Sequence, residues 1–491
     1  MDELMAQRVA KLEQIRARGS DPYPLRVSRT HTASEVTAIV EALPDAQAEE
    51  AATTVDVAGR VMARRDMGKA TFLDLQDGSG RIQVLLRQNQ LGDDLYEALR
   101  LIDLGDFVGA QGTPMRTRTG QPTVSATSWV MLAKALRSPP EKYHGLTDAE
   151  ARQRHRYLDL MANEETRRVF TIRSQVVSAI RRYLDGRGFL EVETPVLQES
   201  AGGAAARPFL THYNVLDEQR ALRISLELHL KRLLVGGFER VYEIGRIFRN
   251  EGMGAKYNPE FTMLETYEAY ADYLDVARSV EEMVSSVCRE VLGGTMVTFR
   301  DCEISLEPPW RRVTFHDALR EYGDLDLGQF PTAERLAAEL KRRGLDLPPN
   351  AGYGKLCDEA MSHYVEPNLI QPTFLLDYPV ELSPLAKRKP DNPRLVERFE
   401  VFIGGFEAGN AYTELNDPID QRLRFEEQLR LRGDGDDEVE MVDEDFLVAL
   451  EHGMPPAGGL GMGIDRLVMI LTGQSTIREV ILFPQHKTVK D

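Results

Sequence analysis

The segment from Arg240 to Tyr270 holds ionisable and aromatic side chains at spacings that suit a binding pocket. It reads RVYEIGRIFRNEGMGAKYNPEFTMLETYEAY, and two apolar stretches around a glycine-containing loop are typical of an antiparallel β-hairpin. Residues two apart share a strand face, which predicts Arg249 and Glu251 on one face. On the second strand the side chains that share a face are Phe261, Met263, Glu265 and Tyr267. Burying unpaired charge is costly, so these faces suit the floor of a polar pocket; the alternative is an exposed sheet face with incidental ion pairs.

A second segment, GGLGMGIDRLVMILTG at residues 458–473, combines alternate glycines with the start of an apolar helix. Glycine lets a backbone approach a ligand closely, and Asp465 and Arg466 would open the helix beside it. The glycines lack the last gap of the dinucleotide fingerprint, and Gly68-Lys69 is followed by Ala70, so no phosphate-binding loop of the Walker type is present. Tight packing of a helix on a strand, with no ligand, explains the same pattern equally well.

The third segment, FIGGFEAGNAYTELNDP at residues 402–418, places Glu407 and Glu414 seven residues apart with Asn410 and Tyr412 between them. In a strand with a bulge, or across a tight turn, these four side chains are expected to converge. Mg²⁺ prefers hard oxygen ligands and shares them with phosphates, so two carboxylates indicate a magnesium site. A pair of solvated glutamates is the alternative.

Composition places limits on the kind of protein. Of 491 residues, 42% are hydrophobic and 28% charged, as in globular domains, and no apolar run is long enough to cross a membrane. Three cysteines are too few for a disulfide framework, which favours a reducing cytoplasm. The net charge of −18 means that any nucleic-acid surface must be local, and Arg60, Arg64, Arg65 and Lys69 form one basic cluster. Acidic residues concentrate in the run from Asp434 to Asp445.

The elements that must position these residues fall into two parts. Apolar residues at helical spacing predict a helix over residues 4–18, and five short alternating strands between Val55 and Leu132 predict a small barrel of the OB type. A long helix is expected from Thr166 to Gly188, followed by the strand FLEVETPVL. The predicted division is a helical extension at 1–50, the barrel at 51–137, a linker at 138–155 and an α+β domain at 156–491, with a helical insertion at about 300–370.

Taken together, the long helix with FLEVETPVL, FRNE through NPEF (248–261) and GLGMGIDR (459–466) resemble the three signature motifs of class II aminoacyl-tRNA synthetases. The resemblance extends over nearly the whole chain. It is closest to lysyl-tRNA synthetases of bacterial type, through stretches such as TDAEARQRHRYLDL, AGGAAARPFLTHYN and LELHLKRLLVGGFERVYEIGRIFRNEG. The signatures of class I synthetases are absent from the sequence.

The resemblance implies an OB-fold that binds the anticodon and a catalytic domain built on an antiparallel sheet flanked by helices. It implies ATP, L-lysine and tRNA(Lys) as substrates, Mg²⁺ as cofactor, and a homodimer formed through the first motif. The expected reaction forms lysyl-adenylate and then transfers lysine to the tRNA 3′ end. Two rivals are a paralogue that lysylates a protein, and a non-catalytic tRNA-binding regulator. The barrel speaks against the first, and the retained motif residues speak against the second.

Site residues follow from the same resemblance. Arg249 and Arg466 are the expected catalytic residues, since they would clamp the phosphates of ATP. The expected ATP site consists of Arg249, Glu251, Tyr257, Asn258, Phe261, Glu407 and Arg466. The expected lysine site consists of Gly203, Glu227, Glu265, Tyr267, Asn410, Tyr412 and Glu414. Mg²⁺ would be bound by Glu407 and Glu414, and the anticodon by Phe72, Gln83 and Arg60.

The sequence departs from the family pattern at three places. Lys256-Tyr257 stands where Arg-His usually precedes NPEF, Ser225-Leu226 replaces Ala-Pro before Glu227, and Gln121 stands where Glu is common. None of these changes removes a residue on which the expected chemistry depends. Several carboxylates in the pocket suit a substrate with two ammonium groups, and would reject the anionic or amide side chains of aspartate and asparagine.

Overall fold

The computed structural model describes residues 3–43, 53–140, 148–200, 202–204, 206–349, 351–431 and 443–488. Most of the acidic run, residues 434–442, and residues 141–147 of the expected linker lie outside these ranges. The chain divides into two compact units, Met1–Thr147 and Asp148–Asp491. Among the described residues, no helix has the length and apolar character needed to span a membrane.

The first unit is a closed five-stranded barrel with strand order β1-β2-β3-β5-β4, as the alternating pattern predicted. β3 and β5 pair in parallel and the other neighbours are antiparallel. The predicted N-terminal helix is present, and Ile15 from it and Val36 from the next helix are buried in the barrel core. The elements are α1 (Glu3–Ala17), α2 (Ala33–Glu41), β1 (Val55–Met67), β2 (Ala70–Gln76), β3 (Arg81–Arg87), α3 (Gln88–Leu91), α4 (Asp93–Ala98), η1 (Leu99–Leu101), β4 (Phe107–Arg116) and β5 (Pro122–Ala133).

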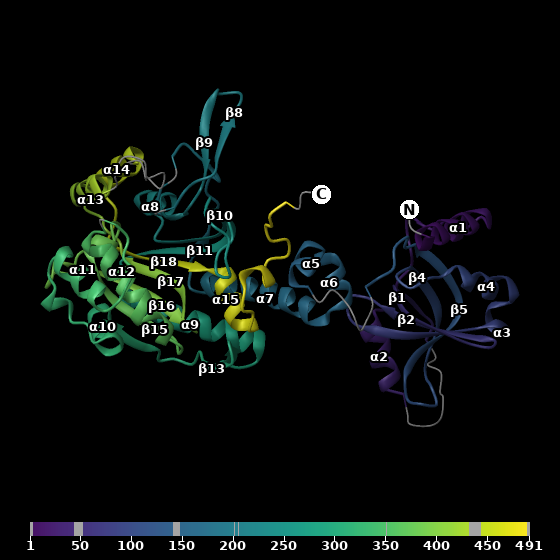
Figure 1. Ribbon diagram of the computed structural model, residues 1–491. Helices are drawn as coiled ribbons and strands as arrows, with labels where there is room; N and C mark the ends of the chain where they lie inside the picture. The colour runs from purple at the N-terminus through teal and green to yellow at the C-terminus, as the bar shows by residue number, and fades with distance from the viewer. Residues whose placement is uncertain are drawn as a thin grey trace. The chain divides into compact units, whose positions relative to one another are not determined.

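The second unit is built on an eight-stranded, mainly antiparallel sheet (Figure 1). Its order is β14-β15-β16-β17-β18-β11-β10-β6, and only the pairs at the two edges are parallel. The strands are β6 (Leu190–Glu191), β10 (Arg240–Phe248), β11 (Glu260–Ala269), β14 (Arg311–Thr314), β15 (Thr373–Pro379), β16 (Leu395–Ile403), β17 (Phe406–Thr413) and β18 (Ala457–Gly463). Smaller sheets consist of β7 (Leu197–Gln198), β8 (Leu210–Tyr213) and β9 (Glu218–Leu222), and of β12 (Met296–Phe299) and β13 (Cys302–Ser305).

Helices cover both faces of this sheet. On one face α7 (Glu164–Gly186), α9 (Tyr273–Leu292) and α15 (Ile464–Thr472) share the main apolar core with alternate strand residues such as Leu264 and Met462. On the other face α8 (Glu227–Val235) and α14 (Glu444–Glu451) pack with Tyr267. The remaining helices are α5 (Ala149–Arg154), α6 (Arg156–Ala162), α10 (Phe315–Gly323), η2 (Leu327–Gln329), α11 (Ala333–Arg342), α12 (Tyr353–Tyr364), η3 (Glu366–Asn368), η4 (Val380–Leu382), α13 (Pro418–Leu431) and η5 (Ile477–Glu479).

The structure differs from the expected elements at three places. FLEVETPVL does not form one strand, because Leu190–Glu191 pairs with β10 in the main sheet whereas Leu197 begins β7, which pairs with β9 in a smaller sheet. The segment 300–370 contains α10, α11 and α12 as expected, but it also supplies β14 at the edge of the main sheet. Residues 149–154 of the expected linker form α5 and belong to the second unit.

Candidate active site

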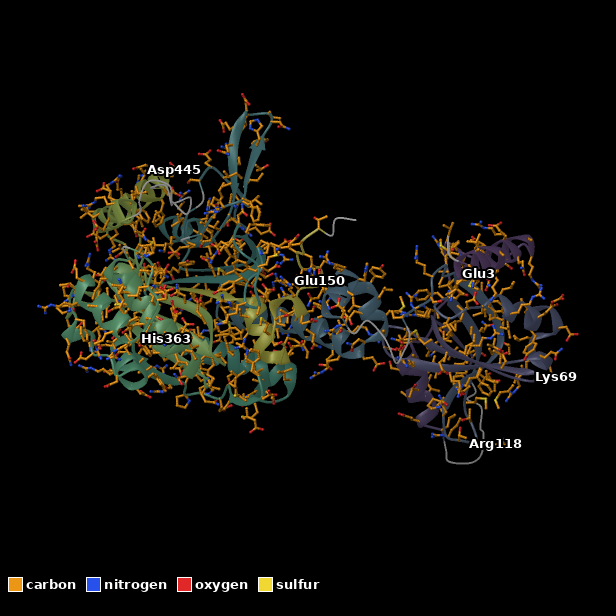
Figure 2. The ribbon with its side chains drawn as sticks, in the orientation of Figure 1. Glu3, Lys69, Arg118, Glu150, His363 and Asp445 are labelled. Atoms are coloured by element: carbon orange, nitrogen blue, oxygen red, sulfur yellow. The ribbon has the colours of Figure 1, made fainter. Side chains whose placement is uncertain are left out.

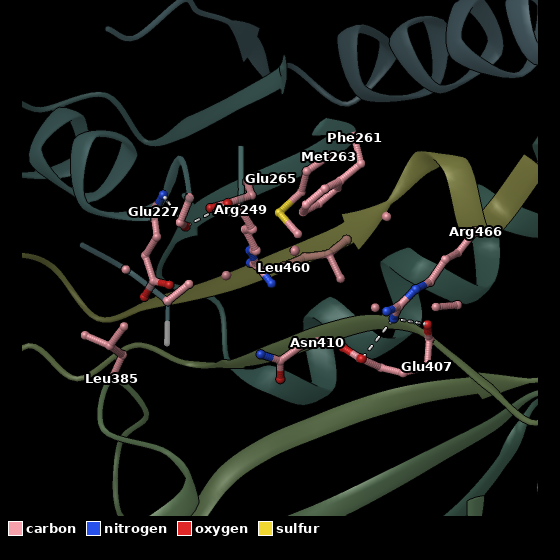
Figure 3. Close-up of a pocket in the computed structure, with 18 of the residues that line it drawn as sticks. Glu227, Arg249, Phe261, Met263, Glu265, Leu385, Glu407, Asn410, Leu460 and Arg466 are labelled. Atoms are coloured by element: carbon pink, nitrogen blue, oxygen red, sulfur yellow. Dashed lines mark hydrogen bonds and ion pairs between the residues drawn. The ribbon is translucent and has the colours of Figure 1, made fainter. Parts of the chain in front are cut away.

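A cavity of about 520 Å³ lies on the face of the sheet opposite α7, α9 and α15. β11, β17 and β18 contribute its floor, and the first residues of α8 lie at one side. Figure 3 shows Glu227 at one end, Glu407 with Arg466 at the other, and Arg249 between them. Residues from the three segments 240–270, 402–418 and 458–473 therefore line one cavity.

The predicted polar face of β11 is confirmed as part of this cavity. Phe261, Met263, Glu265 and Tyr267 all line it, and Glu265 is 3% exposed. The Glu265 carboxylate accepts hydrogen bonds from Ser225 Oγ and the Leu226 amide, both at 2.9 Å, and from the Tyr267 hydroxyl at 3.0 Å. Burial, and then the nearby charge of Glu227, raise the pKa of Glu265 to about 7. This carboxylate is therefore held in place and keeps its proton to a higher pH than a solvated glutamate does.

The expected lysine-site residues lie around that carboxylate with one exception. Gly203, Glu227, Asn410 and Tyr412 also line the cavity, whereas Glu414 is fully buried and is not among the residues that line it. The left-handed backbone of Gly203, with φ of +87°, favours glycine at the cavity wall. The Tyr412 hydroxyl donates to Glu227 Oε1 at 2.6 Å, and Asn410 Oδ1 accepts from Arg398 Nε at 2.9 Å.

Lys231 is a functional candidate that sequence analysis missed. Its Nζ atom donates to Glu227 Oε1 at 2.6 Å and forms an ion pair with Glu414. Burial opposes the charge of Lys231, but the two carboxylates outweigh it and raise its pKa. The pKa of Glu414 is raised well above its usual range because burial and Glu227 outweigh Lys231. The signal was present in ELHLKRLLV, where Glu227 and Lys231 are four residues apart on one face of a helix.

At the other end of the cavity, Arg466 is fixed by Glu407. Its Nη1 atom donates to the backbone oxygen of Glu407 at 2.8 Å and to Oε2 at 3.0 Å (Figure 3). Burial opposes ionisation of Glu407, but Arg466 outweighs it and lowers the pKa. The guanidinium also lies 5.5 Å from the ring centroid of Tyr257.

A second carboxylate near Glu407, Glu400 on β16, was also missed; it is not among the residues that line the cavity. Arg398 Nη2 donates to Glu400 Oε1 at 2.6 Å. Burial raises the pKa of Glu400 to about 7, with Arg398 opposing and the charge of Glu407 adding to the effect. β16 and β17 are neighbours, with Glu400 opposite Asn410 and Phe402 opposite Glu407. The available signal was that Arg398 and Glu400 are two residues apart, and so share a face, in the strand LVERFEVFI.

The predicted joint magnesium site of Glu407 and Glu414 is wrong. β17 does contain the expected bulge, because its register with β16 shifts between Val401 and Phe402. The bulge brings Glu407 and Asn410 to one face but leaves the chain extended. Seven residues of strand separate Glu407 from Glu414 by about 20 Å, too far for one ion to contact both. Glu407 belongs instead with Glu400, and Glu414 with Lys231.

Arg249 lies in the loop after β10 rather than on the strand, so its predicted strand face with Glu251 is also wrong. β10 ends at Phe248, and the Glu251 amide donates to the Arg249 carbonyl at 2.9 Å in a turn. Nε and Nη2 of Arg249 each reach the Ile224 carbonyl only at 3.4 Å, and the guanidinium lies 5.3 Å from the Phe261 ring centroid. These long contacts leave donors directed at the cavity, which Arg249 and Glu251 both line.

The remaining expected ATP residues also line the cavity. Asn258 Nδ2 donates to the Glu260 carbonyl at 2.6 Å, while its buried Oδ1 has no hydrogen-bond partner among the described residues. Asp465, at the start of α15, accepts from the Thr262 amide and from Arg173 Nη1, both at 2.6 Å. It thereby fixes β11 against the glycine-rich turn. Within the described ranges, no group of three or more His, Cys, Asp or Glu side chains forms a metal site.

In the barrel, register places the three expected anticodon residues on one face. Phe72 lies opposite Arg65 on β1, Gln83 lies opposite Asp74, and Arg60 lies opposite Gln76. Phe72 is half-buried, with Arg65 5.9 Å from its ring centroid.

Gln83 is held by hydrogen bonds within the barrel. It donates to Gln121 Oε1 at 3.3 Å and accepts from Thr123 Oγ1 at 3.0 Å.

The other members of the basic cluster do not join the face of Arg60, Phe72 and Gln83 as a set. Arg64 instead donates hydrogen bonds to the Asp66 carboxylate and to the Leu99 carbonyl. Lys69 lies at the β1–β2 turn, where Figure 2 labels it.

Comparisons with known proteins agree with both units. Residues 148–487 match the family of tRNA synthetases class II (D, K and N), and residues 55–132 match an OB-fold nucleic acid binding domain. The lysine–tRNA ligase of Dehalococcoides mccartyi is 55% identical over 489 residues, covering 99% of this chain and 98% of that protein. That of Roseiflexus castenholzii is 53% identical over 486 residues, covering 99% and 98%. That of Bacillus subtilis is 49% identical over 486 residues, covering 99% and 97%.

Proposed function

The chain belongs to the class II tRNA synthetases of the D, K and N family and ligates lysine to tRNA, and we propose that its cavity performs the activation step with the residues described above. The observation that supports this most strongly is the set of buried carboxylates. Glu227 and Glu265 line one end of the cavity, with Glu414 behind them. Two ammonium groups of lysine would satisfy carboxylates that a neutral side chain would leave unpaired.

ATP is proposed to occupy the end of the cavity lined by Arg249, Phe261 and Arg466. A buried acceptor, Asn258 Oδ1, would take a hydrogen bond from the exocyclic amine of adenine. In the first step a carboxylate oxygen of lysine attacks the α-phosphorus, and the bond to the bridging oxygen breaks as pyrophosphate leaves. Arg249 would stabilise charge on the α-phosphoryl oxygens, and Arg466 charge on the leaving group. Neither role requires a proton transfer.

Mg²⁺ is proposed to bind Glu400 and Glu407. The fit rests on the position of the pair: Glu400 and Glu407 lie on the neighbouring strands β16 and β17, and the charge of Glu407 contributes to the raised pKa of Glu400. Mg²⁺ in proteins often takes one or two carboxylates and completes its shell with phosphates and water. Bound there, the ion would offset negative charge on the phosphates of ATP. Arg398 and Arg466 hold the two carboxylates in position.

Transfer to tRNA is proposed to follow class II chemistry. The 3′-hydroxyl of the terminal ribose attacks the carbonyl carbon of the adenylate, and AMP leaves. The barrel face that carries Arg60, Phe72 and Gln83 would bind the anticodon, with one base stacked on Phe72. The proposed compartment is the cytoplasm, which agrees with three free cysteines, Cys288, Cys302 and Cys357.

A homodimer is proposed from exposed apolar residues around the first motif. Val196, Leu197 and Leu210 are 40%, 52% and 60% exposed, and Leu190 is 47% exposed. Leu197 on β7 and Leu210 on β8 belong to one small sheet through β9, and exposed apolar side chains that gather on one surface commonly mark a protein interface. Light scattering at micromolar concentration tests this proposal: a mass of twice 55.3 kDa supports it, and a monomer contradicts it.

The acceptor is tested by charging. Incubation with ATP, radiolabelled lysine and either tRNA(Lys) or a protein extract freed of RNA separates the two enzymatic readings. Label that appears on tRNA alone supports the proposal. Label on protein would favour a protein-lysylating paralogue, and tRNA binding without label on either acceptor would favour a non-catalytic regulator.

A further inference from the structure

Behind the lysine end of the cavity lies an ammonium group that belongs to the protein itself. Lys231 on α8 is 0% exposed, and its Nζ atom bridges Glu227 Oε1, at 2.6 Å, and Glu414. Glu227 lines the cavity, whereas Glu414 lies behind it, so the bridge joins a carboxylate on the wall to one in the interior. Burying an ammonium group is costly unless the group is paired, so the two carboxylates must offset the cost of burying Lys231.

Two aromatic rings complete the surroundings of this ammonium. Nζ lies 5.4 Å from the ring centroid of Tyr412 on β17 and 5.8 Å from that of Phe446 on α14. The Tyr412 hydroxyl donates to the same Glu227 oxygen that Lys231 contacts, at 2.6 Å. Three elements thus fix the position of one charge, and that charge in turn fixes the orientation of the Glu227 carboxylate.

Lys231 brings one positive charge to the carboxyl groups at this end of the cavity. It contacts Glu227 and Glu414 directly, whereas Glu265 is held by Ser225, Leu226 and Tyr267. Without Lys231, the Glu227 carboxylate would lose the ionic partner that fixes it against the interior, and its orientation toward the cavity would no longer be set.

We propose that Lys231 is a specificity-determining positioning residue: it holds the Glu227 carboxylate on the cavity wall in the orientation in which that carboxylate pairs with an ammonium group of lysine. This inference rests on the proposed function of the cavity. Lys231 does not touch the reacting atoms, and it acts on the substrate through Glu227 and Glu414. A purely structural ion pair would stabilise α8 against β17 and would have no effect on the choice of amino acid.

The test compares Lys231→Met and Lys231→Arg with the wild type in lysine-dependent ATP–pyrophosphate exchange. The methionine variant is expected to raise the KM for lysine at least tenfold, with the KM for ATP within about twofold. Its preference for lysine over norleucine, a competitor of similar length without the terminal ammonium, should fall at least tenfold. Because Arg restores the charge, that variant should recover most of the lysine KM.

Lys355→Met is the matched control. Lys355 on α12 pairs with Asp358 at 2.9 Å and Glu359 at 3.2 Å, also at helical spacing, but lies outside the cavity lining. It should leave both KM values unchanged. If Lys231→Met does not fold, Lys231→Gln replaces it with the same expectation.

A folded neutral variant with the lysine KM and norleucine discrimination of the wild type would overturn the inference, as would equal increases in both KM values. Wild-type enzyme that exchanges no pyrophosphate with lysine would instead overturn the proposed function.

Discussion

Gly459 lies directly against the carboxylate of Glu414: a Cβ atom built at Gly459 would be 1.9 Å from Glu414 Oε1 and 2.6 Å from Cε1 of Tyr267. β18 pairs with β11 here, with Gly459 opposite Tyr267, so the strand cannot move away without breaking the sheet. The glycine at this position is required by the buried carboxylate behind the cavity. This relationship links the third motif to the lysine end of the site.

Gly459→Ala is therefore expected to displace Glu414 or Tyr267, and to raise the lysine KM more than the ATP KM. Gly461→Ala on the same strand is the folding control, because its nearest neighbour would be 3.9 Å away. The measurement is lysine-dependent exchange together with a thermal melt. A Gly459 variant that melts and exchanges as the wild type does would contradict the packing described here.

Removal of the Arg249 guanidinium should affect catalysis rather than folding. Loss of one preorganised donor to a developing charge typically lowers kcat by about 10²–10³-fold. Arg249→Ala is expected to lose exchange activity to at least that extent. Its melting temperature should change little, because the contacts of Arg249 to the Ile224 carbonyl are long. Arg249→Lys keeps the charge but not the planar pair of donors, so it should recover only part of the rate. Full activity in the alanine variant would rule out the role given to Arg249.

The raised pKa of Glu265 predicts a pH dependence for lysine binding. Burial and Glu227 raise this pKa to about 7, so Glu265 is mostly neutral at pH 6 and mostly ionised at pH 8. Since the ionised form attracts ammonium, the lysine KM should fall as pH rises through 7. The stability of the ligand-free protein is expected to follow the opposite trend: a folded pKa above the unfolded value gives stability at low pH that is lost as pH rises through 7.

Glu265→Gln provides the control for that pH dependence. The lysine KM of this variant should be high and should vary much less between pH 6 and pH 8. Measurement of both KM values across this range separates the effect from changes in ATP binding. A wild-type lysine KM that rises with pH would contradict the assignment.

The corrected carboxylate pair predicts which glutamates control the response to magnesium. Glu400→Gln and Glu407→Gln should each raise the Mg²⁺ concentration needed for half-maximal exchange at saturating lysine. Glu414→Gln should leave that concentration unchanged and instead raise the lysine KM, because Glu414 lies with Lys231 at the other end of β17. If the Mg²⁺ concentration for half-maximal exchange rose in the Glu414 variant and not in the Glu400 variant, the magnesium site would consist of Glu407 and Glu414 after all.

Phe72→Ala separates anticodon binding from activation. Loss of one base–aromatic stack costs about 1–3 kcal/mol, so the KM for tRNA(Lys) should rise roughly 5- to 150-fold. Exchange without tRNA should be unchanged and serves as the internal control. Equal loss in both reactions would indicate that Phe72 supports the fold rather than the tRNA contact.

The sequence predicted the elements that local patterns determine. The five strands of the barrel, the β10–β11 hairpin and the long helix α7 all follow from alternation or helical periodicity, and the structure contains each of them. The β11 face that lines the cavity could be predicted because Phe261, Met263, Glu265 and Tyr267 alternate strictly.

What could not be predicted depends on pairing between distant segments. Glu400 and Glu407 belong together because β16 lies beside β17, and a spacing count within one segment cannot reveal a cross-strand partner. Lys231 meets Glu414 only after α8 packs over the sheet. The spacing of Glu407 and Glu414 was compatible with either a bulged strand or a tight turn. It therefore could not predict that β17 is extended and separates the two side chains.

Amino-acid-dependent ATP–pyrophosphate exchange shows whether the buried carboxylates select lysine. All twenty amino acids are assayed separately without tRNA. Exchange is expected with lysine alone. Exchange with aspartate or asparagine would contradict the role of the carboxylates, and no exchange with any amino acid would contradict the activation step itself.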